Sequence, residues 1–435
     1  MFDLRPVGYV IGLLVACLGL TMIPPLLVDL AEGQGHWRSF AQSAILTFFI
    51  GGLIALACQN GTREGLSIQQ TFILTTGVWL ALPIFGALPF LFGATQASPV
   101  DAFFEAMSGL TTTGSTVFSG LDTLPKGLLL WRGILQWLGG IGIIVVAMVF
   151  LPELRVGGMQ IFRSEAFETM GKILPRATEI ASQISVIYVA LTLMCLFSYM
   201  MTGMNAFDAT VHALTTIATG GFANYDASFG AFSGSTEYVA ALFMILAALP
   251  FVRYVQMVNG HHKALFHDRQ VYGFIGTLLV LIGFASLVLI YVLPQGWQLS
   301  LRQVVFNVTS IITGTGYASA DYMGWGNLLI TMFFFIGLIG GCAGSTACSI
   351  KVFRYQILFA SVKSQLAKTQ SPHAVVPPRY EGRKIDDDVL NSVMSFFVFF
   401  LVTMGVLAVA LGMTGLDFIT SLSGAASALA NIGPG

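Results

Sequence analysis

The chain has 435 residues, of which 55% are hydrophobic and 9% are charged, and its formal net charge is −1. A soluble protein carries roughly 25% charged residues, because its surface must face water. The composition therefore excludes a water-soluble domain, and the charge balance gives no indication of a nucleic acid or an acidic substrate. We expect a polytopic membrane protein whose main solvent is lipid.

Nine apolar segments are long enough to cross a bilayer as helices. They cover residues 7–31, 37–58, 69–93, 131–152, 180–202, 236–259, 271–293, 326–350 and 389–412. The first segment is too long for the apolar core of a secretory signal, so we interpret it as a spanning helix.

Four shorter helix-forming segments accompany these spans, at residues 100–113, 206–219, 302–315 and 418–431. Helices of about 12–15 residues cannot cross roughly 30 Å of hydrocarbon. Each segment ends in a sequence rich in Thr or Gly, which predicts a half-membrane helix that turns back. Irregular backbone is tolerated at membrane depth only where it lines a water-filled path or is buried in protein.

The distribution of Lys and Arg predicts a cytoplasmic N-terminus. With this orientation the inner side holds Arg63, Arg155, Arg163, Lys172, Arg176, Lys263, Arg269, Lys351, Arg354, Lys363, Lys368, Arg379, Arg383 and Lys384. The outer side keeps only Arg38, Lys126, Arg132 and Arg302. All four short segments then enter the membrane from outside.

The outer loops and the starts of the short helices carry acidic residues, namely Asp101, Glu105, Asp122, Asp208, Asp226, Glu237, Asp321 and Asp417. We expect each of them to be a solvated loop acid or a helix N-cap. Together they would raise the local cation concentration at an outer mouth.

The short segments form an internal repeat when the last glycines of FEAMSGLTTTG (104–114), VHALTTIATG (211–220), NVTSIITGTG (307–316) and GAASALANIG (424–433) are matched. Ser108, Ser310 and Ser427 then share a column with Leu214. The unit is helix, pore loop and helix, repeated about every 100 residues. The predicted division is a two-helix segment (1–66), three pore repeats (67–178, 179–268 and 269–370), and a cytoplasmic linker with an incomplete fourth repeat (371–435).

The repeated glycines predict a binding path for a dehydrated monovalent cation. Stacked backbone carbonyls can replace the ion's water without holding it too tightly, and glycine allows the backbone conformations that aim them inward. The matched glycines are Gly114, Gly220, Gly316 and Gly433. Ordinary Gly-rich turns would explain one Thr-Gly pair, but four copies in phase favour a filter. The negative C-terminal ends of the short helices would also favour a cation.

The loops TTTGST (111–116), ATGGF (218–222), TGTGY (313–317) and NIGPG (431–435) resemble the filter loops of the Trk/Ktr/HKT superfamily, most closely the bacterial Trk-type potassium uptake membrane subunit. The resemblance covers the whole chain. It implies an all-α polytopic fold with pseudo-fourfold repeats of helix, pore loop and helix around a central ion pore, preceded by two extra helices. It also implies K⁺ coordination by the carbonyls of Thr112, Thr113, Gly114, Ala218, Thr219, Gly220, Gly314, Thr315, Gly316, Asn431, Ile432 and Gly433. Gly114 indicates potassium, because relatives with serine there tend to favour sodium.

A run of small residues, GGCAGSTACS at 340–349, interrupts the apolar segment 326–350. Small residues at this depth weaken a continuous helix, although they also suit a close helix–helix packing face. In the superfamily the matching stretch is an intramembrane loop that gates the pore beneath the filter. The resemblance therefore predicts a gate loop containing Gly340, Gly341, Gly344, Ser345 and Thr346.

The resemblance also implies a location and partners. Trk-type subunits lie in the bacterial cytoplasmic membrane, form homodimers and bind a cytosolic nucleotide-binding regulatory subunit of the RCK type (TrkA-like), for which the charged stretch 351–388 is a plausible docking surface. No covalent cofactor is expected, and nucleotide would act only through that partner. The family continues past the fourth loop through a final helix, so we expect the complete protein to extend beyond Gly435.

Two alternatives to a channel-like uptake protein remain open from the residues. An ion-coupled symporter would need an acid at mid-membrane to carry a proton, and none is clearly placed there. A membrane enzyme or scaffold would need buried catalytic His, Asp or Glu, and the candidates Glu105 and His212 lie at pore-helix positions.

Overall fold

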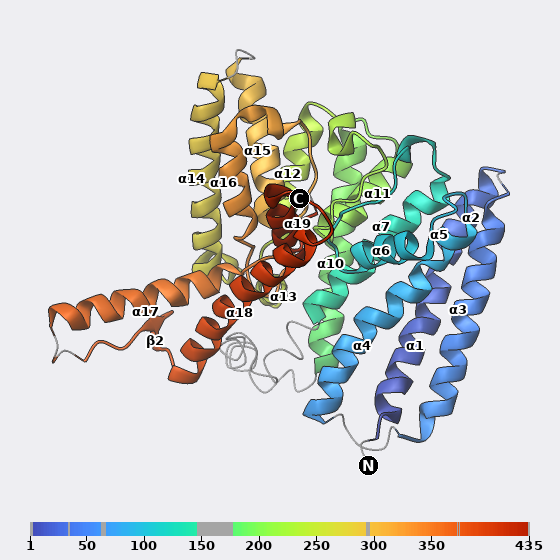
Figure 1. Cartoon of the computed structure of the whole chain (residues 1–435), viewed down its shortest axis with the longest axis horizontal. Coiled ribbons are helices and arrows are strands. Elements are labelled where there is room, and N and C mark those ends of the chain that lie inside the picture. Colours follow the sequence, from blue (N-terminus) through green and yellow to red (C-terminus); the bar gives the residue numbers. More distant parts are fainter. Residues whose placement is uncertain are drawn as a thin grey trace.

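The computed structural model describes residues 3–433 except 34, 62–66, 146–176, 293–295, 372 and 374. Several predictions fall outside this described part, namely those on Arg63, 146–152, Arg155, Arg163, Lys172, Arg176 and 434–435. The described chain is a bundle of helices, with one short antiparallel pair of strands, β1 (Arg379–Tyr380) and β2 (Arg383–Lys384). The helical fold predicted from the sequence is confirmed, and the strand pair is the one addition to it in the described part of the chain (Figure 1).

The chain begins with two antiparallel spans that lie beside the rest of the bundle (Figure 1). The first consists of α1 (Arg5–Thr21) and α2 (Ile23–Ala31), and the second is α3 (Trp37–Cys58). Their backbones approach closely, because a Cβ added at Gly12 would lie 2.8 Å from the carbonyl oxygen of Gly51. Small residues of this kind let membrane helices pack without a hydrophobic driving force.

Four helix–pore helix units follow. The entering helices are α4 (Ile68–Gly86) with α5 (Leu88–Phe92), α10 (Ala177–Met201), α14 (Arg269–Val292) and α18 (Asp387–Gly412). The pore helices are α6 (Pro99–Leu110), α11 (Ala206–Ile217), α15 (Trp297–Thr313) and α19 (Phe418–Ala430). The outgoing helices are α7 (Lys126–Val145), α12 (Ser235–Ala247) with α13 (Phe251–Val258), and α16 (Asn327–Gly337).

Short 3₁₀ turns complete the connections, at η1 (Gln59–Gly61), η2 (Leu121–Thr123), η5 (Ser228–Ala231), η6 (Leu265–His267) and η7 (Tyr322–Trp325). After the third unit, α17 (Val352–Gln370) runs out of the bundle and leads to β1 and β2. This helix lies at the same end of the bundle as the N-terminus (Figure 1).

Two of the nine predicted spans are interrupted in the described structure by a sharp bend or an irregular loop. Seven described helices are long and apolar enough to cross a membrane. The segment predicted at 236–259 is instead broken between α12 and α13, which meet at 86°. Pro250 lies at this break and has no N–H to continue the helix. The segment predicted at 326–350 is helical only as far as Gly337, and an irregular loop follows.

Three of the four pore helices begin at a side-chain N-cap. Ser98 and Asn205 accept the backbone N–H three residues on, at 3.2 and 2.8 Å, and Asp417 accepts that of Ile419 at 3.1 Å. These bonds satisfy N–H groups that have no partner within the helix. Hydrogen bonds from Thr420 and from the backbone also hold the pKa of Asp417 below its usual value.

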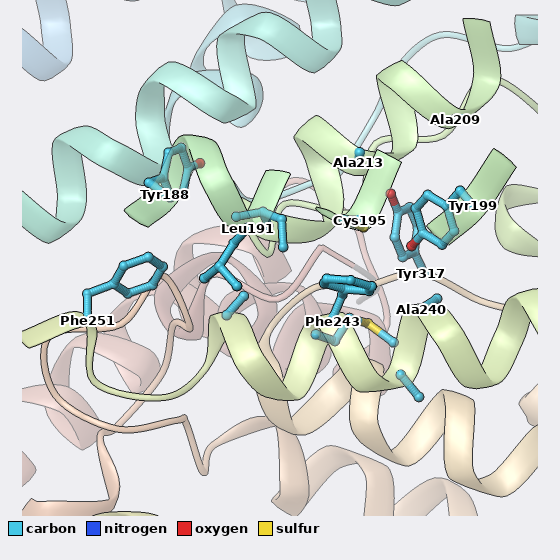
Figure 2. Close-up of a cluster of buried hydrophobic side chains, with 14 of the residues drawn as sticks. Tyr188, Leu191, Cys195, Tyr199, Ala209, Ala213, Ala240, Phe243, Phe251 and Tyr317 are labelled. Carbon is cyan, nitrogen blue, oxygen red and sulfur yellow. The ribbon is translucent and has the colours of Figure 1, made fainter. Parts of the chain in front are cut away.

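The interior and the lipid-facing surface differ as expected for a membrane bundle. A buried aromatic cluster joins α10, α12 and the third pore loop, with Tyr188, Tyr199, Phe243 and Tyr317 among its members (Figure 2). By contrast, only 11% of the most apolar window of α18 is buried. Lipid can solvate that surface, so its exposure carries no hydrophobic cost.

Candidate functional site

Each pore helix is followed by an irregular loop in which two positions have positive φ. The first position is occupied by Thr112, Thr219, Gly314 and Asn431, with φ of 60°, 50°, 73° and 59°. The second is occupied by Gly114, Gly221, Gly316 and Gly433, with φ of 85°, 74°, 81° and 92°. L-residues other than glycine rarely adopt this conformation, so the second position explains the repeated glycine.

The second loop differs by one residue from the alignment made on the sequence. In the first loop the N–H preceding the glycine, at Thr113, bonds to the carbonyl of Ser108 at 2.9 Å. The corresponding bond in the second loop runs from Gly220 to Thr215, also at 2.9 Å. The position that matches Gly114 is therefore Gly221, whereas the sequence alignment matched Gly220. The repeat's hydroxyl column likewise contains Thr215 and not Leu214, because the Gly220–Gly221 pair left the register ambiguous.

The four loops contact one another in cyclic order. A Cβ added at Gly114 would fall on the carbonyl oxygen of Gly220, and one added at Gly221 would fall on that of Thr315. A Cβ added at Gly314 would lie 3.5 Å from the carbonyl oxygen of Asn431. Finally, a Cβ at Gly433 would lie 2.6 Å from that of Thr113. First meets second, second meets third, third meets fourth and fourth meets first, so the loops surround one common axis.

The first and third loops hold their own shape through hydroxyl groups. The Oγ1 atoms of Thr111 and Thr113 lie 2.7 Å apart, and those of Thr313 and Thr315 lie 2.8 Å apart. In addition, Ser108 Oγ donates to the carbonyl of Ser115 at 2.6 Å. Ser310 makes the equivalent bond to Tyr317 at 2.7 Å.

The fourth loop is attached to the first. The amide nitrogen of Asn431 donates to the carbonyl of Thr111 at 2.7 Å, and its amide oxygen accepts the hydroxyl of Thr113. Ser115 Oγ donates to the carbonyl of Gly433 at 2.6 Å. Asn tolerates positive φ better than most residues, so one side chain meets both the conformational and the bonding requirement at position 431.

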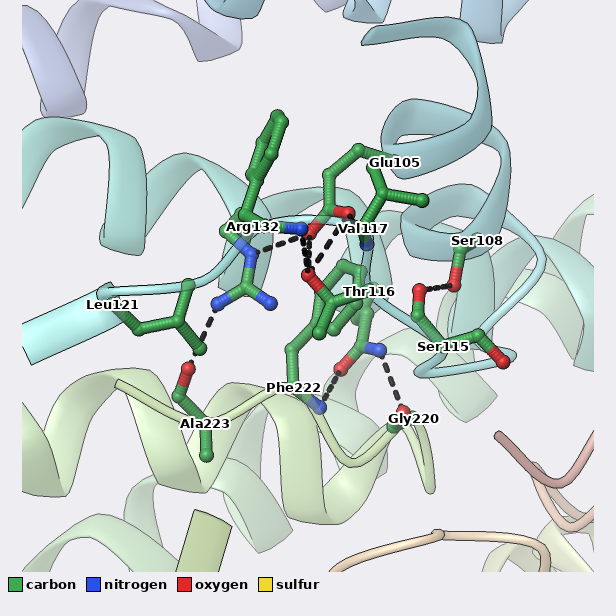
Figure 3. A network of polar contacts seen from close by, with 12 residues as sticks. Glu105, Ser108, Ser115, Thr116, Val117, Leu121, Arg132, Gly220, Phe222 and Ala223 are labelled. Atoms are coloured by element: carbon green, nitrogen blue, oxygen red, sulfur yellow. Dashed lines mark hydrogen bonds and ion pairs between the residues drawn. The ribbon is translucent and has the colours of Figure 1, made fainter. Parts of the chain in front are cut away.

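The second loop is attached to α7 of the first repeat. Gln136 Nε2 donates to the carbonyl of Gly220 at 2.6 Å, and its Oε1 accepts the N–H of Phe222 at 3.0 Å. Figure 3 shows Gly220 and Phe222 at this contact. Sequence reasoning did not single out Gln136, because a lone Gln in an apolar helix has no motif. The unusual Gly220–Gly221 pair was the available signal.

A buried ion pair lies behind the first two loops (Figure 3). Arg132 Nε is 2.8 Å from Glu105 Oε1, and the side chains are 2% and 0% exposed. Glu105 Oε2 accepts the N–H of Val117 at 3.1 Å, while Arg132 donates to the carbonyl of Ala223 at 2.8 Å and covers the Phe222 ring. These charges are paired and hydrogen-bonded, as buried charges must be.

The expectation that these acids are solvated or capping is wrong for Glu105 and Asp208, while Glu237 is not solvated but accepts the N–H of Gly234 at the start of α12. Glu105, Asp208 and Glu237 are all buried. Asp208 accepts hydrogen bonds from Asn224 and Tyr225, both at 2.7 Å, and Glu237 pairs with Arg302. Burial, followed by the hydrogen bond to Asp208, raises the pKa of Tyr225 to about 12. These three acids are engaged in contacts within the protein and are not free at the surface.

The predicted gate loop is an irregular, buried segment between α16 and α17. Gly340, Gly341, Gly344, Ser345 and Thr346 all lie within it and are buried. Its two ends run side by side, because Gly340 N donates to the carbonyl of Ile350 at 2.9 Å. The alternative of a helix–helix packing face is therefore wrong, since this segment is not helical.

This loop is bonded to the break between α12 and α13. The carbonyl of Ala248 accepts the N–H of Cys342 at 3.0 Å, and that of Ala247 accepts the hydroxyl of Thr346 at 3.0 Å. In return, Phe251 N donates to the carbonyl of Gly344 at 2.9 Å. The broken helix and the irregular loop thus satisfy each other's backbone groups at membrane depth.

The same loop contacts the loops that follow the pore helices through Cys348. Its Sγ accepts from Asn431 Nδ2 at 2.9 Å and lies 3.7 Å from Thr112 Oγ1. A Cβ added at Gly314 would lie 3.0 Å from the Cβ of Cys348. Cys348 therefore lies beside the first positive-φ position of three loops.

The fold and site together define a polytopic membrane transport protein with four re-entrant loops around one axis. The sequence of residues 36–435 matches the TrkH family, described as cation transport proteins. The chain belongs to this family. Its members are transport proteins, so the alternative of a membrane enzyme does not hold.

Named relatives match over nearly the whole chain. The chain is 41% identical to the Trk system potassium uptake protein TrkI of Halomonas elongata, covering 99% of this chain and 87% of that protein. It is 35% identical to the Trk system potassium uptake protein TrkH of Escherichia coli K12, covering 99% and 90%. The crystal structure of the potassium transporter TrkH from Vibrio parahaemolyticus superposes with a TM-score of 0.92 at 32% identity, covering 100% of this chain and 91% of that chain.

Proposed function

We propose that this protein takes up potassium across the bacterial cytoplasmic membrane through a channel-like pore. The observation that carries the proposal is the cyclic contact of four loops, each with a positive-φ glycine beside a neighbouring loop's carbonyl oxygen. Such a ring can replace the hydration shell of a monovalent cation with neutral oxygen ligands. The names of the relatives at 41% and 35% identity support potassium as the ion.

The ion ligands in this proposal are backbone carbonyls of the loop residues. They are Thr112, Thr113, Gly114, Thr219, Gly220, Gly221, Gly314, Thr315, Gly316, Asn431, Ile432 and Gly433. This set replaces Ala218 with Gly221, because Ala218 occupies the position of Thr111 in the observed register. Each pore helix directs the negative end of its dipole toward the ring, which favours a cation.

The intramembrane loop is the gate in this proposal. It lies against the inner side of the filter loops at Cys348, and its bonds to Ala247 and Ala248 hold it in place. Opening would need it to exchange these bonds for water or for other partners. The N-terminus and α17 would then face the cytoplasm, and α17 with β1 and β2 would offer a surface to a nucleotide-binding regulatory subunit, in a homodimer of the chain.

The test is K⁺ or Rb⁺ uptake in cells that lack their own potassium transporters, comparing wild type with Gly316→Ser. Gly316 has φ +81°, so serine strains this loop and should shift transport toward Na⁺. Wild-type cells should grow on low potassium and accumulate Rb⁺. Unchanged transport and selectivity in the variant would contradict the filter assignment. A strict dependence of uptake on a proton or sodium gradient would instead favour a symporter.

A further inference from the structure

The four filter loops are braced in different ways. In the first loop the hydroxyls of Thr111 and Thr113 contact each other across Thr112, the first positive-φ residue. The hydroxyls of Thr313 and Thr315 do the same across Gly314 in the third loop. The equivalent residues of the second loop are Ala218 and Gly220, which have no hydroxyl. The second loop therefore lacks the brace that its first and third counterparts carry.

Gln136 occupies the place of the missing brace. A Cβ added at Gly220 would fall on the amide group of Gln136, so the space of a side chain at position 220 is already filled from α7. The side-chain amide of Gln136 makes hydrogen bonds on both sides of Gly221. It donates to the carbonyl of Gly220 at 2.6 Å and accepts the N–H of Phe222 at 3.0 Å. Gln136 is fully buried, so water does not compete for these bonds.

Gly220 is also the residue whose carbonyl oxygen meets Gly114 of the first loop. Within the part of the chain that the structure describes, no side chain donates to the corresponding carbonyls of Thr113 and Thr315. The amide of Gln136 thus fixes the direction of one oxygen of the ring. Because its N–H donates a hydrogen bond to that oxygen, it also reduces the negative charge that the oxygen presents to an ion.

We infer that Gln136 is a positioning residue that sets the ion selectivity of the second filter loop from outside the loop. This inference rests on the proposed function, because it needs the ring to be the ion path. Without the amide, the Gly220–Gly221 segment has neither side-chain hydroxyls nor a partner from α7. Its carbonyl can then turn, and the ring can adapt to the smaller Na⁺.

The test measures the permeability ratio of K⁺ to Na⁺ for Gln136→Met, which keeps the side-chain length but removes both hydrogen bonds. We expect the ratio to fall about tenfold, the size of effect seen when buried polar groups lose a partner. Gln136→Glu provides a second variant in case the first does not accumulate. In its ionised form it can still accept from Phe222 N but no longer donates to Gly220, so its ratio should fall as rising pH removes the proton of the buried carboxyl.

Thr192→Val is the matched control. It removes the hydroxyl that accepts a hydrogen bond at 3.1 Å from Trp137, the neighbour of Gln136 on α7, and that donates to the carbonyl of Tyr188 on its own helix. Its permeability ratio should equal that of wild type. A selective wild type with unchanged ratios in both Gln136 variants would overturn the inference alone. A wild type without selective K⁺ conduction would overturn the proposed function itself.

Discussion

At the scale of single residues, the site depends on which glycine of a pair takes the strained conformation. Gly221 has φ +74° and faces the carbonyl of Thr315, whereas Gly220 has no positive φ and faces Gln136. Two adjacent glycines thus serve different needs, one conformational and one steric. Either glycine could be aligned with Gly114 from the sequence, and only the backbone conformation distinguishes them.

Replacing Gly221 with alanine should therefore abolish K⁺ uptake. The added methyl both strains a positive φ, at about 1–2 kcal/mol, and displaces the carbonyl of Thr315. Gly234→Ala is the control, because Gly234 has φ +88° but no atom within 4 Å of its added Cβ. Rb⁺ uptake at matched protein abundance should be lost in the first variant and nearly normal in the second. Normal uptake by the Gly221 variant would contradict the ring contact, and loss of uptake in both variants would mean that backbone strain alone explains the effect.

At the scale of elements, two irregular segments support each other in the membrane. Pro250 breaks the second outgoing helix, and the carbonyl of Leu246, which a continuous helix would bond to residue 250, accepts the Tyr254 hydroxyl at 2.8 Å. The next carbonyls, of Ala247 and Ala248, are bonded by the intramembrane loop. The small residues at 340–349 signalled the loop, but its docking site on another repeat has no local sequence signature.

Weakening this contact should favour an open pore. Thr346→Val removes the hydroxyl bond to Ala247, and the loss of about 1 kcal/mol should raise basal K⁺ flux about fivefold. Ser345→Ala serves as control, since Ser345 Oγ bonds only within the loop, to the carbonyl of Cys342. Flux can be recorded from purified protein in liposomes. A Thr346 variant with unchanged or reduced flux would argue that the loop does not gate.

Most of the helices could be predicted, because the length of an apolar segment and a Thr-Gly pair at its end are local features of the sequence. The short pore helices 100–113, 206–219 and 418–431 agree closely with α6, α11 and α19. What could not be predicted depends on contacts between distant residues. The bend at Pro250 lies in an otherwise uniform apolar run, and the burial of Glu105 becomes understandable only once Arg132 of another helix lies 2.8 Å away.

At the scale of the molecule, the four loops have similar backbone shapes, but different side chains hold each of them in place. The first and third loops are held by their own threonines, while the second and fourth are held by Gln136 and Asn431, which bond across loop boundaries. The first repeat therefore supports its two neighbours as well as itself. Four loops with different sequences thus form one ring, and the proposed ion coordination does not require four identical repeats.

The central claim is that the ring of loop carbonyls binds K⁺ on the common axis. It is tested most directly by crystallising the protein with Tl⁺, a heavy substitute for K⁺, and locating the ion by anomalous scattering. The account predicts an anomalous peak on the axis, within coordination distance of the carbonyl oxygens of Thr113, Gly220 and Thr315, that disappears when Na⁺ replaces Tl⁺. An axis without such a peak, with Tl⁺ bound elsewhere in the bundle, would contradict it.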